Sequence, residues 1–498
     1  MRRIVFVEPK PPDLHIFTRM PMPRLGTVLL GTILRQKGYE VKSYVEVVRD
    51  LDIEDILKAD AVGISTITST APRAYELARQ IKRAGIPVFM GGPHTTCLPD
   101  EALEHCDYVL RGEADEVIAD FVAALEKGSG FEAIPGLSFR ENGRVIHNES
   151  VAVCRQMDNI PCPDFTIVSG LEDGLHGLSI TPIMTSRGCP YDCSFCSVTG
   201  MFGRQYRFRS QERVLEELAR HREMGGKFVF FYDDNFAANR QRTKELLRSM
   251  IEQNLTPPWT AQVRVEVARD PELMELMQRS NCHTLYLGFE SVNPETLKAY
   301  NKRQTVEDIE KCIERLHAHN IRIHGMFVFG ADDDTVDTIH ETVKFAKEND
   351  LESLQFLILT PLPGTRMFHE LESQDRLISR DWSLYDTHHV VFEPKGMTPY
   401  ELQLETIKAT ARFYSMGQIA KRFVRLDMFN VSIKAYGRRL AKKWARKNES
   451  FLEYTKNITE AGRQIELAAR NTAEDIRERF SQLEASGGFP GIHADKPR

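Results

Sequence analysis

Short apolar runs alternate with amphipathic segments through the first 127 residues of the chain. Runs of branched and aromatic residues predict five β-strands, over residues 4–7, 41–45, 61–65, 88–90 and 108–110. Between them, residues 27–37 and 71–83 repeat apolar side chains at helical spacing. Strands that alternate with helices are typical of a parallel sheet covered on both faces. We therefore predict a doubly wound, Rossmann-like α/β domain over residues 1–135.

The rest of the chain divides into three further parts. Residues 136–180 are rich in Gly, Pro, Asn and Asp and predict a connector, with a hairpin around Asn142-Gly143. From Pro182 the alternation repeats six times over 181–375, with strands predicted at 183–185, 228–232, 260–264, 284–288, 323–329 and 353–359. Six units are too few to close an eight-stranded barrel. Residues 376–498 predict a mostly helical cap and tail.

Composition fits a folded protein. Of 498 residues, 42% are hydrophobic and 27% are charged, with a formal net charge of -6. The first apolar run is too short for a signal peptide, and no stretch approaches 18 uncharged apolar residues. Nine cysteines without paired spacing favour a reducing compartment. We therefore predict a cytoplasmic protein.

One segment departs from this even distribution of charge. Residues 421–447 hold ten Lys or Arg against the single Asp427, a local charge of +9. An apolar stripe at helical spacing runs beside these cations (Phe429, Ile433, Tyr436, Leu440 and Trp444). The stripe predicts an amphipathic cationic helix over 429–447. It is a candidate for peripheral contact with an anionic membrane, but docking on the acidic remainder of the chain is slightly favoured. Nucleic acid is a third alternative, which we do not expect.

Cys189, Cys193 and Cys196 form a compact group in the spacing Cys-x3-Cys-x2-Cys. Gly188 and Pro190 indicate that the group lies on a loop. The other six cysteines are scattered, so a disulfide framework is not indicated (Cys97, Cys106, Cys154, Cys162, Cys282 and Cys312). Structural zinc normally takes four protein ligands, and no fourth Cys or His stands nearby. Three thiolates on a four-iron cluster would leave one iron open to a small ligand.

This loop, with the aromatic Phe195 just before its last cysteine, resembles the radical S-adenosylmethionine (SAM) signature. The resemblance implies a partial (β/α)6 barrel. It also implies that the three cysteines hold a 4Fe–4S cluster, at which SAM is cleaved to a 5'-deoxyadenosyl radical. Further SAM contacts are implied at the carboxyl ends of the barrel strands (Phe195, Asp233, Asp234, Arg264, Glu290 and Ser291). From the residues alone, the polar ones among these could equally be helix caps or ion pairs.

Small and polar residues follow the third, fourth and fifth predicted strands of the first domain (Ser65, Thr66, Thr68, Gly91, Gly92, His94, Thr95, Gly112 and Glu113). Ligands of open parallel sheets bind at these strand ends, although ordinary turn chemistry would explain the same residues. Together with the cysteine loop, they resemble the cobalamin-binding domain of cobalamin-dependent radical SAM enzymes over about residues 1–400. Thr18 stands where the cobalt-ligating motif requires Gly, so His15 is not expected to ligate cobalt.

The resemblance implies a methyltransferase that carries a methyl group from SAM, through methylcobalamin, to an unactivated carbon. The tail resembles the branch with hopanoid and bacteriochlorophyllide methylases, so a small hydrophobic substrate, a lipid or a tetrapyrrole, is expected. No catalytic acid or base is required, and the electron donor would be of flavodoxin or ferredoxin type. The alternatives are a radical enzyme that catalyses cyclisation, rearrangement or oxidation without methyl transfer, and a non-enzymatic corrinoid-binding sensor. Tyr385, His388 and His389 are expected to pack a cap rather than face substrate.

Overall fold

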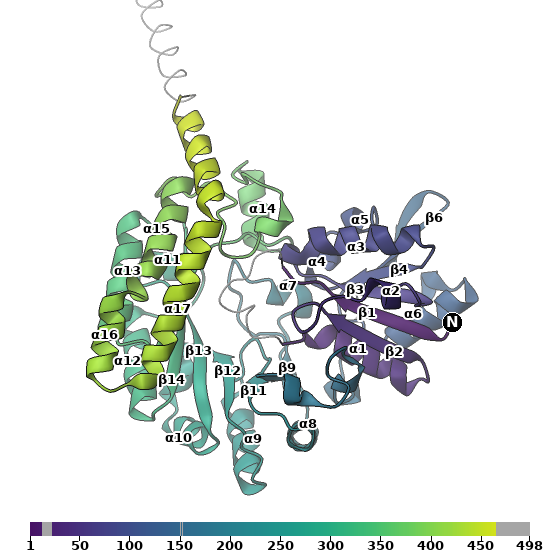
Figure 1. The fold of residues 1–498 in the computed structure, drawn as a ribbon, viewed down its shortest axis with the longest axis horizontal. Coiled ribbons are helices and arrows are strands. Elements are labelled where there is room, and N and C mark those ends of the chain that lie inside the picture. Colours follow the sequence, from purple (N-terminus) through teal and green to yellow (C-terminus); the bar gives the residue numbers. More distant parts are fainter. Residues whose placement is uncertain (12–21, 150, 152, 465–498) are drawn as a thin grey trace, which may run out of the picture.

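Two parallel sheets organise the protein, whose computed structural model describes residues 1–11, 22–149, 151 and 153–464. Figure 1 shows the two sheets side by side, each with its own helices. The first has the order β2-β1-β3-β4-β5-β6-β7, and the second has the order β15-β14-β13-β12-β11-β8. The α/β fold predicted from the alternation is confirmed. The cobalt-ligand question at His15 lies outside the described residues.

The first sheet is doubly wound because its side chains alternate between two apolar layers. Its parallel strands are β1 (Arg3–Glu8), β2 (Glu40–Val45), β3 (Ala61–Ser65), β4 (Val88–Gly91) and β5 (Tyr108–Leu110). Ile4 and Phe6 pack with α1 (Leu25–Gln36) and α6 (Ile118–Lys127). Val5 and Val7 pack on the opposite face with α3 (Ala71–Arg83). Period-two alternation thus buries both faces of the sheet.

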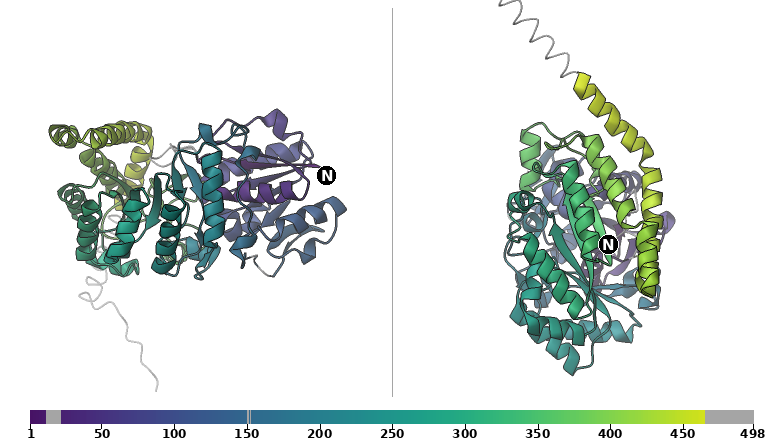
Figure 2. Two further views of the ribbon diagram at one scale, coloured as in Figure 1. Left: turned by 90° about the horizontal axis from the view of Figure 1, so that it is seen from below. Right: turned by 90° about the vertical axis from the view of Figure 1, so that its left-hand side faces the viewer.

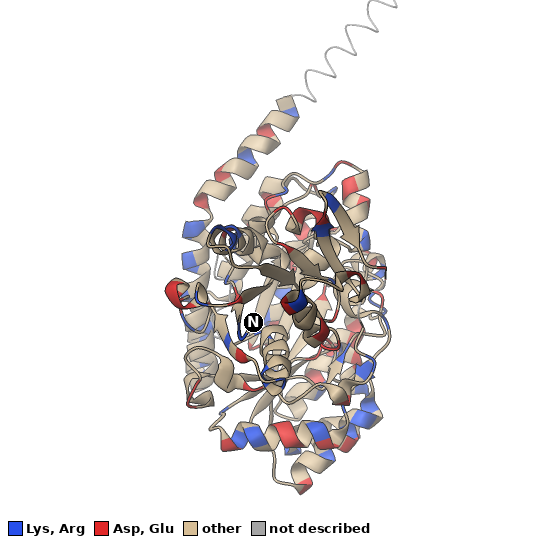
Figure 3. Ribbon diagram, turned by 90° about the vertical axis from the view of Figure 1, so that its right-hand side faces the viewer, with Lys and Arg blue, Asp and Glu red and all other residues tan. Residues whose placement is uncertain are grey.

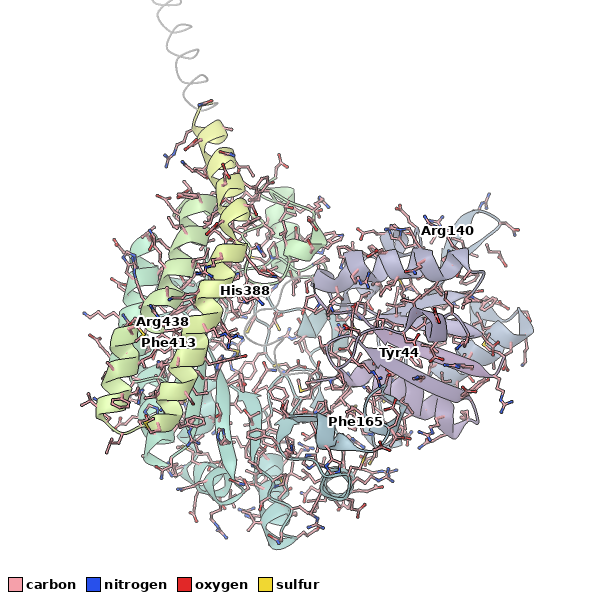
Figure 4. All side chains as sticks on the ribbon, viewed as in Figure 1. Tyr44, Arg140, Phe165, His388, Phe413 and Arg438 are labelled. Atoms are coloured by element: carbon pink, nitrogen blue, oxygen red, sulfur yellow. The ribbon has the colours of Figure 1, made fainter. Side chains whose placement is uncertain are left out.

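The predicted hairpin forms, and it extends the first sheet. Strands β6 (Leu137–Glu141) and β7 (Arg144–His147) pair with each other, and β6 pairs antiparallel with β5. After it, buried apolar residues of the segment 154–178 pack against α1, among them Phe165 (Figure 4). This segment carries short 3-10 turns and forms an apolar layer between the first sheet and the barrel.

The second sheet is the predicted six-stranded partial barrel, and all five of its strand pairs are parallel. Its strands are β8 (Thr181–Ile183), β11 (Val229–Phe231), β12 (Trp259–Val263), β13 (Cys282–Glu290), β14 (Arg322–Phe329) and β15 (Ser353–Ile358). Helices α8 (Gln211–Glu223), α9 (Arg240–Glu252), α10 (Pro271–Arg279), α12 (Val306–Ala318) and α13 (Val336–Glu348) cover the outside. The first strand lies two residues earlier than predicted, because Ser186 and Arg187 form a separate strand, β9, that pairs antiparallel with β10 (Arg207–Phe208).

Three C-terminal helices pack beside β15. Helix α15 (Pro399–Phe413) lies against β15 and α13, and α16 (Met416–Val424) and α17 (Met428–Lys447) form a hairpin outside it (Figures 1 and 2). Residues 449–464 continue as helix away from the barrel. No helix in the described part of the chain is long and apolar enough to cross a membrane.

The predicted helix at 429–447 forms, but its apolar stripe was assigned to the wrong face. The residues that α17 buries are Asn430, Lys434, Gly437, Leu440 and Ala441, so only Leu440 of the stripe is fully inside. Lys434, predicted to flank the stripe as an exposed cation, is only 1% exposed. At Gly437 an added Cβ would lie 2.4 Å from the Tyr414 ring, so glycine permits the close approach. Docking of α17 on the barrel, the favoured alternative, is confirmed.

Candidate active site

A cavity of about 350 Å³ lies between the carboxyl ends of the two parallel sheets. Loops after β3, β4 and β5 form one side of it. The barrel, β9 and the short helix α7 (Val198–Phe202), which follows the three cysteines, form the other side, and the cysteines themselves do not line it. The lining includes Ser65, Gly91, Gly92, Gly112 and Glu113 from the first sheet, and Met184, Arg187, Met201, Phe202, Tyr232, Asp234 and Gln262 from the second part. A ligand held by one sheet would therefore face a ligand held by the other.

Glycines and apolar side chains shape the first-sheet side of the cavity. Gly92 has φ +104°, and a Cβ there would lie 2.3 Å from the Thr66 carbonyl oxygen, so only glycine fits. At Gly63 a Cβ would meet the Phe89 ring at 2.5 Å. Phe6, Ile64 and Phe89 line the cavity beneath this glycine rim. The result is a smooth, mostly apolar surface that suits a broad, flat ligand.

Four of the residues predicted to bind cobalamin do not line the cavity: Thr66, Thr68, His94 and Thr95. Thr66 is buried and donates to the Gly91 carbonyl at 3.1 Å. The His94 ring lies 3.1 Å from the Tyr75 hydroxyl and 3.4 Å from Glu101 Oε1. Trp382 Nε1 donates to the same Glu101 oxygen at 2.9 Å. In the structure His94 thus joins the first domain to the segment after the barrel, and the strand-end pattern did not distinguish that role from ligand binding.

Glu113 lies at the centre of a buried cluster of ion pairs between the two halves of the molecule. Its Oε2 is 2.7 Å from Arg187 Nη1, and its Oε1 is 2.6 Å from Arg207 Nη2. Asp115 pairs with Arg187 at 2.6 Å. Arg187 and Arg207 are directly opposite each other on β9 and β10, the ribbon from which the cysteine loop emerges. One carboxylate of the first sheet therefore holds both ends of that loop.

On the first-sheet side of the cavity, two buried polar atoms have no partner among the described residues. They are Arg24 Nη1 and Thr27 Oγ1, from the residues at the start of α1. The other side of the Arg24 guanidinium is fixed, since Nε lies 3.1 Å from Glu8 Oε1 and Nη2 donates to the Ser65 carbonyl at 3.3 Å. Two unsatisfied donors at an apolar cavity are costly unless a ligand accepts from them. Cobalamin, which carries amide groups around a flat macrocycle, fits this combination.

The cysteine loop is anchored at several points along its backbone. Gly188 opens it with φ +84°, where a Cβ would lie 2.5 Å from the Gln205 carbonyl oxygen. Asn301 Nδ2 and Arg366 Nη2 each donate to the Asp192 carbonyl at 3.0 Å. Met367 N donates to the Ser194 carbonyl at 3.3 Å. These bonds come from the barrel, so the loop is held over the carboxyl ends of its strands.

The three cysteines of this loop fit an iron–sulfur cluster better than a single metal ion. All three are free, half-buried thiols. In the described part of the chain, no three His, Cys, Asp or Glu side chains are grouped as ligands of one ion. A four-iron cluster spaces its thiolates over the corners of a cube, so its ligands need not converge on one point. Burial raises the pKa of the Cys196 thiol to about 12. The thiol would therefore lose its proton only when it binds to a metal cation.

The structure separates the two aspartates predicted to contact SAM. Asp233 is fully buried and accepts from Thr185 N at 2.8 Å, Ser186 N at 2.7 Å and Thr185 Oγ1 at 2.6 Å. Its carboxylate therefore fixes the chain between β8 and the cysteine loop. Asp234 lines the cavity, and burial together with the Asp233 charge raises the pKa of the Asp234 carboxyl to about 7. Only Asp234 is placed to meet a ligand in the cavity.

Arg264 ends β12 beside the cysteine loop. Its Nη1 lies 3.9 Å from Cys193 Sγ, and its guanidinium stacks 3.8 Å over the Tyr191 ring. Glu266 accepts from Arg264 Nη2 at 3.1 Å, and the Lys302 carbonyl accepts from the same nitrogen. A cation so close to a cluster thiolate stabilises its negative charge.

Glu290, Ser291 and Phe195 lie near the same edge of the barrel. Glu290 has φ +63° and pairs with Lys302 Nζ at 2.5 Å, so its charge is already compensated. Ser291 Oγ accepts from Asn293 N at 3.0 Å. Phe195 packs edge-on against Tyr300 at 4.9 Å. Their predicted contacts with SAM stay predictions.

The C-terminal aromatic cluster packs a cap, as expected. Tyr385 lies in the apolar core beside Trp382, with ring centroids 4.8 Å apart. His389 Nδ1 is 3.0 Å from Asp386 Oδ2, and the His388 ring packs against Trp444 of α17 (Figure 4). None of these three residues lines the cavity between the sheets.

The residues that sequence reasoning missed are Arg24, Arg187, Arg207 and Asp115. The available signal was the position of the two arginines, one directly before Gly188 and one just after the loop. Their partner could not be assigned, because it lies more than 70 residues earlier in the chain.

Comparison with known proteins agrees with this geometry. The Radical SAM superfamily model matches residues 183–346, and the B12 binding domain model matches residues 18–122. An uncharacterized methyltransferase of Pyrococcus horikoshii is 33% identical over 404 residues, which cover 79% of this chain and 88% of that protein. Bacteriochlorophyllide d C-12(1)-methyltransferase of Chlorobaculum tepidum is 33% identical over 402 residues, covering 80% and 84%.

Among solved structures, the radical SAM methyltransferase TsrM from Kitasatospora setae, with cobalamin and a 4Fe–4S cluster bound, has a TM-score of 0.63. Its identity is 20%, and the match covers 75% of this chain and 78% of that one, so it supports the fold alone. The fold and the two family models together define a radical SAM enzyme that carries a B12-binding domain. The chain belongs to the cobalamin-dependent radical SAM family.

Membership settles the cofactors and the class of protein. The enzyme uses SAM, a 4Fe–4S cluster and cobalamin, and it acts on a small molecule. Both relatives described above are named as methyltransferases, so methyl transfer is better supported than ring formation or a non-enzymatic sensor.

Proposed function

We propose that this enzyme methylates an unactivated carbon of a small polycyclic hydrophobic molecule of tetrapyrrole or lipid type. The cavity between the two sheets carries the proposal, because its lining combines the strand-end glycines of the first sheet with Arg187 of β9, the strand from which the cysteine loop emerges. When bound, the cluster supplies the electron that cleaves SAM, and cobalamin carries the methyl group between SAM and substrate. The substrate class rests on the bacteriochlorophyllide methyltransferase as a relative and on the apolar cavity walls.

Each side chain at the cavity then has a defined task. Asp234, deprotonated, attracts the ammonium group of SAM, while Asp233 holds the neighbouring backbone. Arg264 compensates the charge at Cys193. Met184, Met201 and Phe202 exclude water from the space where a substrate radical would be exposed to solvent.

We further propose two partners. The electron comes from a protein of flavodoxin or ferredoxin type. A hydrophobic substrate reaches the enzyme at a membrane surface, to which the protein binds peripherally.

The decisive experiment is anaerobic reconstitution followed by product analysis. Wild-type protein with iron, sulfide and cobalamin should produce S-adenosylhomocysteine and 5'-deoxyadenosine in equal amounts when a tetrapyrrole or hopanoid panel contains the substrate. Cys193→Ala should lose the cluster absorbance and reduce 5'-deoxyadenosine formation at least a thousandfold, while Cys312→Ala, a buried thiol elsewhere, should keep both. Deoxyadenosine without S-adenosylhomocysteine would instead assign the enzyme to the ring-forming or oxidising class.

A further inference from the structure

The hairpin of α16 and α17 carries an inverted distribution of apolar and charged residues. Helix α16 buries Arg422 and exposes a continuous apolar face that includes Met416, Phe423 and Val424. Val424 and Leu426 are each 81% exposed, and Met428 is 56% exposed. A helix on the outside of a water-exposed protein normally shows the opposite arrangement. Contiguous exposed apolar residues of this kind mark an interaction surface.

The inversion is held in place by ion pairs, so it is not a helix docked the wrong way round. Asp350, just after α13, lies 3.1 Å from Arg422, 3.2 Å from Lys421 and 2.8 Å from Arg425. Arg422 also pairs with Asp427 at 3.1 Å. Rotating α16 to bury Phe423 and Val424 would pull these cations away from their partners. The apolar face must therefore look outward.

Helix α17, the second helix of this hairpin, carries a row of cations. A shallow groove along it is lined by Ala435 and six basic residues: Arg438, Arg439, Lys442, Lys443, Arg446 and Lys447. Within the described residues, Arg438, Arg439, Lys442, Lys443 and Arg446 have no carboxylate partner. On the first domain, by contrast, basic and acidic residues are interspersed (Figure 3). Within the part of the chain that the structure describes, these cations therefore remain available to a negatively charged partner.

We propose that the α16–α17 hairpin, residues 416–447, docks the enzyme on an anionic lipid bilayer. Apolar side chains at one end would enter the boundary between headgroups and acyl chains, and the cations along α17 would lie on the phosphates. Two copies of the chain meeting through α17 would instead bring like charges together. The link to a hydrophobic substrate rests on the function proposed above, but the docking surface does not.

Vesicle flotation of the reconstituted full-length protein tests this proposal. Wild type should float with vesicles of phosphatidylcholine and phosphatidylglycerol, and added salt should weaken the binding. Lys442→Glu/Lys443→Glu should reduce binding at least tenfold. Phe423→Ser/Val424→Ser should also reduce it, and these positions are too exposed to change the thermal midpoint. Arg222→Glu/Lys227→Glu, an exposed pair on the far crossover of the barrel, is the matched control and should bind as wild type does.

Three results would overturn the proposal. The first is a wild type that does not float with vesicles, and the second is an Arg222→Glu/Lys227→Glu variant that loses as much binding as the α17 variant does. The third result is a wild type that does not bind vesicles but forms a concentration-dependent dimer, which Phe423→Ser/Val424→Ser abolishes. SAM cleavage is measured on the same preparations without vesicles. Vesicle binding without SAM cleavage would contradict the proposed reaction alone. SAM cleavage without vesicle binding would contradict the docking surface and the proposed membrane contact, but not the proposed reaction.

Discussion

Charged side chains are used in opposite ways at the cavity and at the C-terminal hairpin. Around the cavity, Glu113, Arg187 and Arg207 are buried and matched, carboxylate to guanidinium, across the boundary between the two sheets. On α17, Lys442 and Lys443 are exposed and unopposed within the described chain. Folding thus pairs the charges around the cavity with each other, whereas it leaves these two lysines of α17 without a partner in the described chain.

The difference shows what each region is built to do. Buried pairs have exact geometric requirements, since each ion loses its water and must regain the energy from one partner. They suit a place where two cofactor sites have to keep their spacing. Exposed cations cost nothing to leave unpaired, and they suit a surface that meets a partner of variable shape. Three substitutions test this contrast, beginning with the largest expected effect.

Glu113→Gln should be the most damaging, because it leaves two buried arginines with weakened partners. Removing one member of a buried pair costs about 3 kcal/mol or more, which should lower the thermal midpoint by several degrees. With both ends of the cysteine loop released, more 5'-deoxyadenosine should form per methylated product. The exposed Glu116→Gln, three residues along, is the control and should change neither quantity. Equal effects of the two variants would mean that the pairs do not hold the loop.

Gly92→Ala should have the next largest effect. The backbone at φ +104° and ψ 176° is strained for alanine by about 1–3 kcal/mol, and the new methyl group would collide with the Thr66 carbonyl. The strand-end loop should shift and weaken cobalamin binding at least tenfold, measured by absorbance titration. The control is Gly462→Ala, whose Cβ would meet no atom within 4 Å and which lies away from the cavity, and it should bind as wild type does. If Gly92→Ala binds cobalamin as tightly as wild type does, the loop that holds Gly92 does not contact the corrinoid.

Lys434→Met should have the smallest effect near neutral pH, and an effect that grows as the pH rises. Burial, followed by the nearby Arg422 charge, lowers the pKa of Lys434 to about 7 from 10.5, although its amine donates to the Leu351 carbonyl and lies 3.3 Å from the Phe413 ring centroid. Between pH 7 and about 10 the unfolded chain therefore binds more protons, so the free energy of unfolding of the wild type should rise with pH. The methionine variant should lack this rise in denaturant titrations. If the free energy of unfolding rises with pH equally in wild type and in Lys434→Met, another group is responsible for the rise.

Local pattern was enough to predict most of the fold. Residues 4–7 are apolar at every position and residues 61–65 at all but the last, Ser65, as buried parallel strands require, and each run lies within one residue of the observed strand. The cysteine loop was equally visible, because its ligands are contained in eight residues. In both cases neighbouring residues carry the whole signal.

What sequence could not provide was pairing at long range. Spacing alone assigned the apolar stripe of α17 to one face, whereas tertiary contacts bury Lys434 over the Phe413 ring instead (Figure 4). His94 has the same surroundings in sequence as Gly91 and Gly92, but its side chain turns to Glu101 and away from the cavity. Asp233 and Asp234 differ only in which side of the chain they project from. Such assignments depend on residues far away in the chain.

The ribbon of β9 and β10 has a consequence for protein engineering. Arg187 and Arg207 are opposite each other and both donate to Glu113. These three residues therefore fix the position of the first domain relative to the barrel. Chimeras that exchange the first domain between relatives should be active only when both parents carry the same residues at these three positions, or when all three residues are transferred together. Substitutions in the barrel could then change the range of substrates without changing the position of the first domain relative to the barrel.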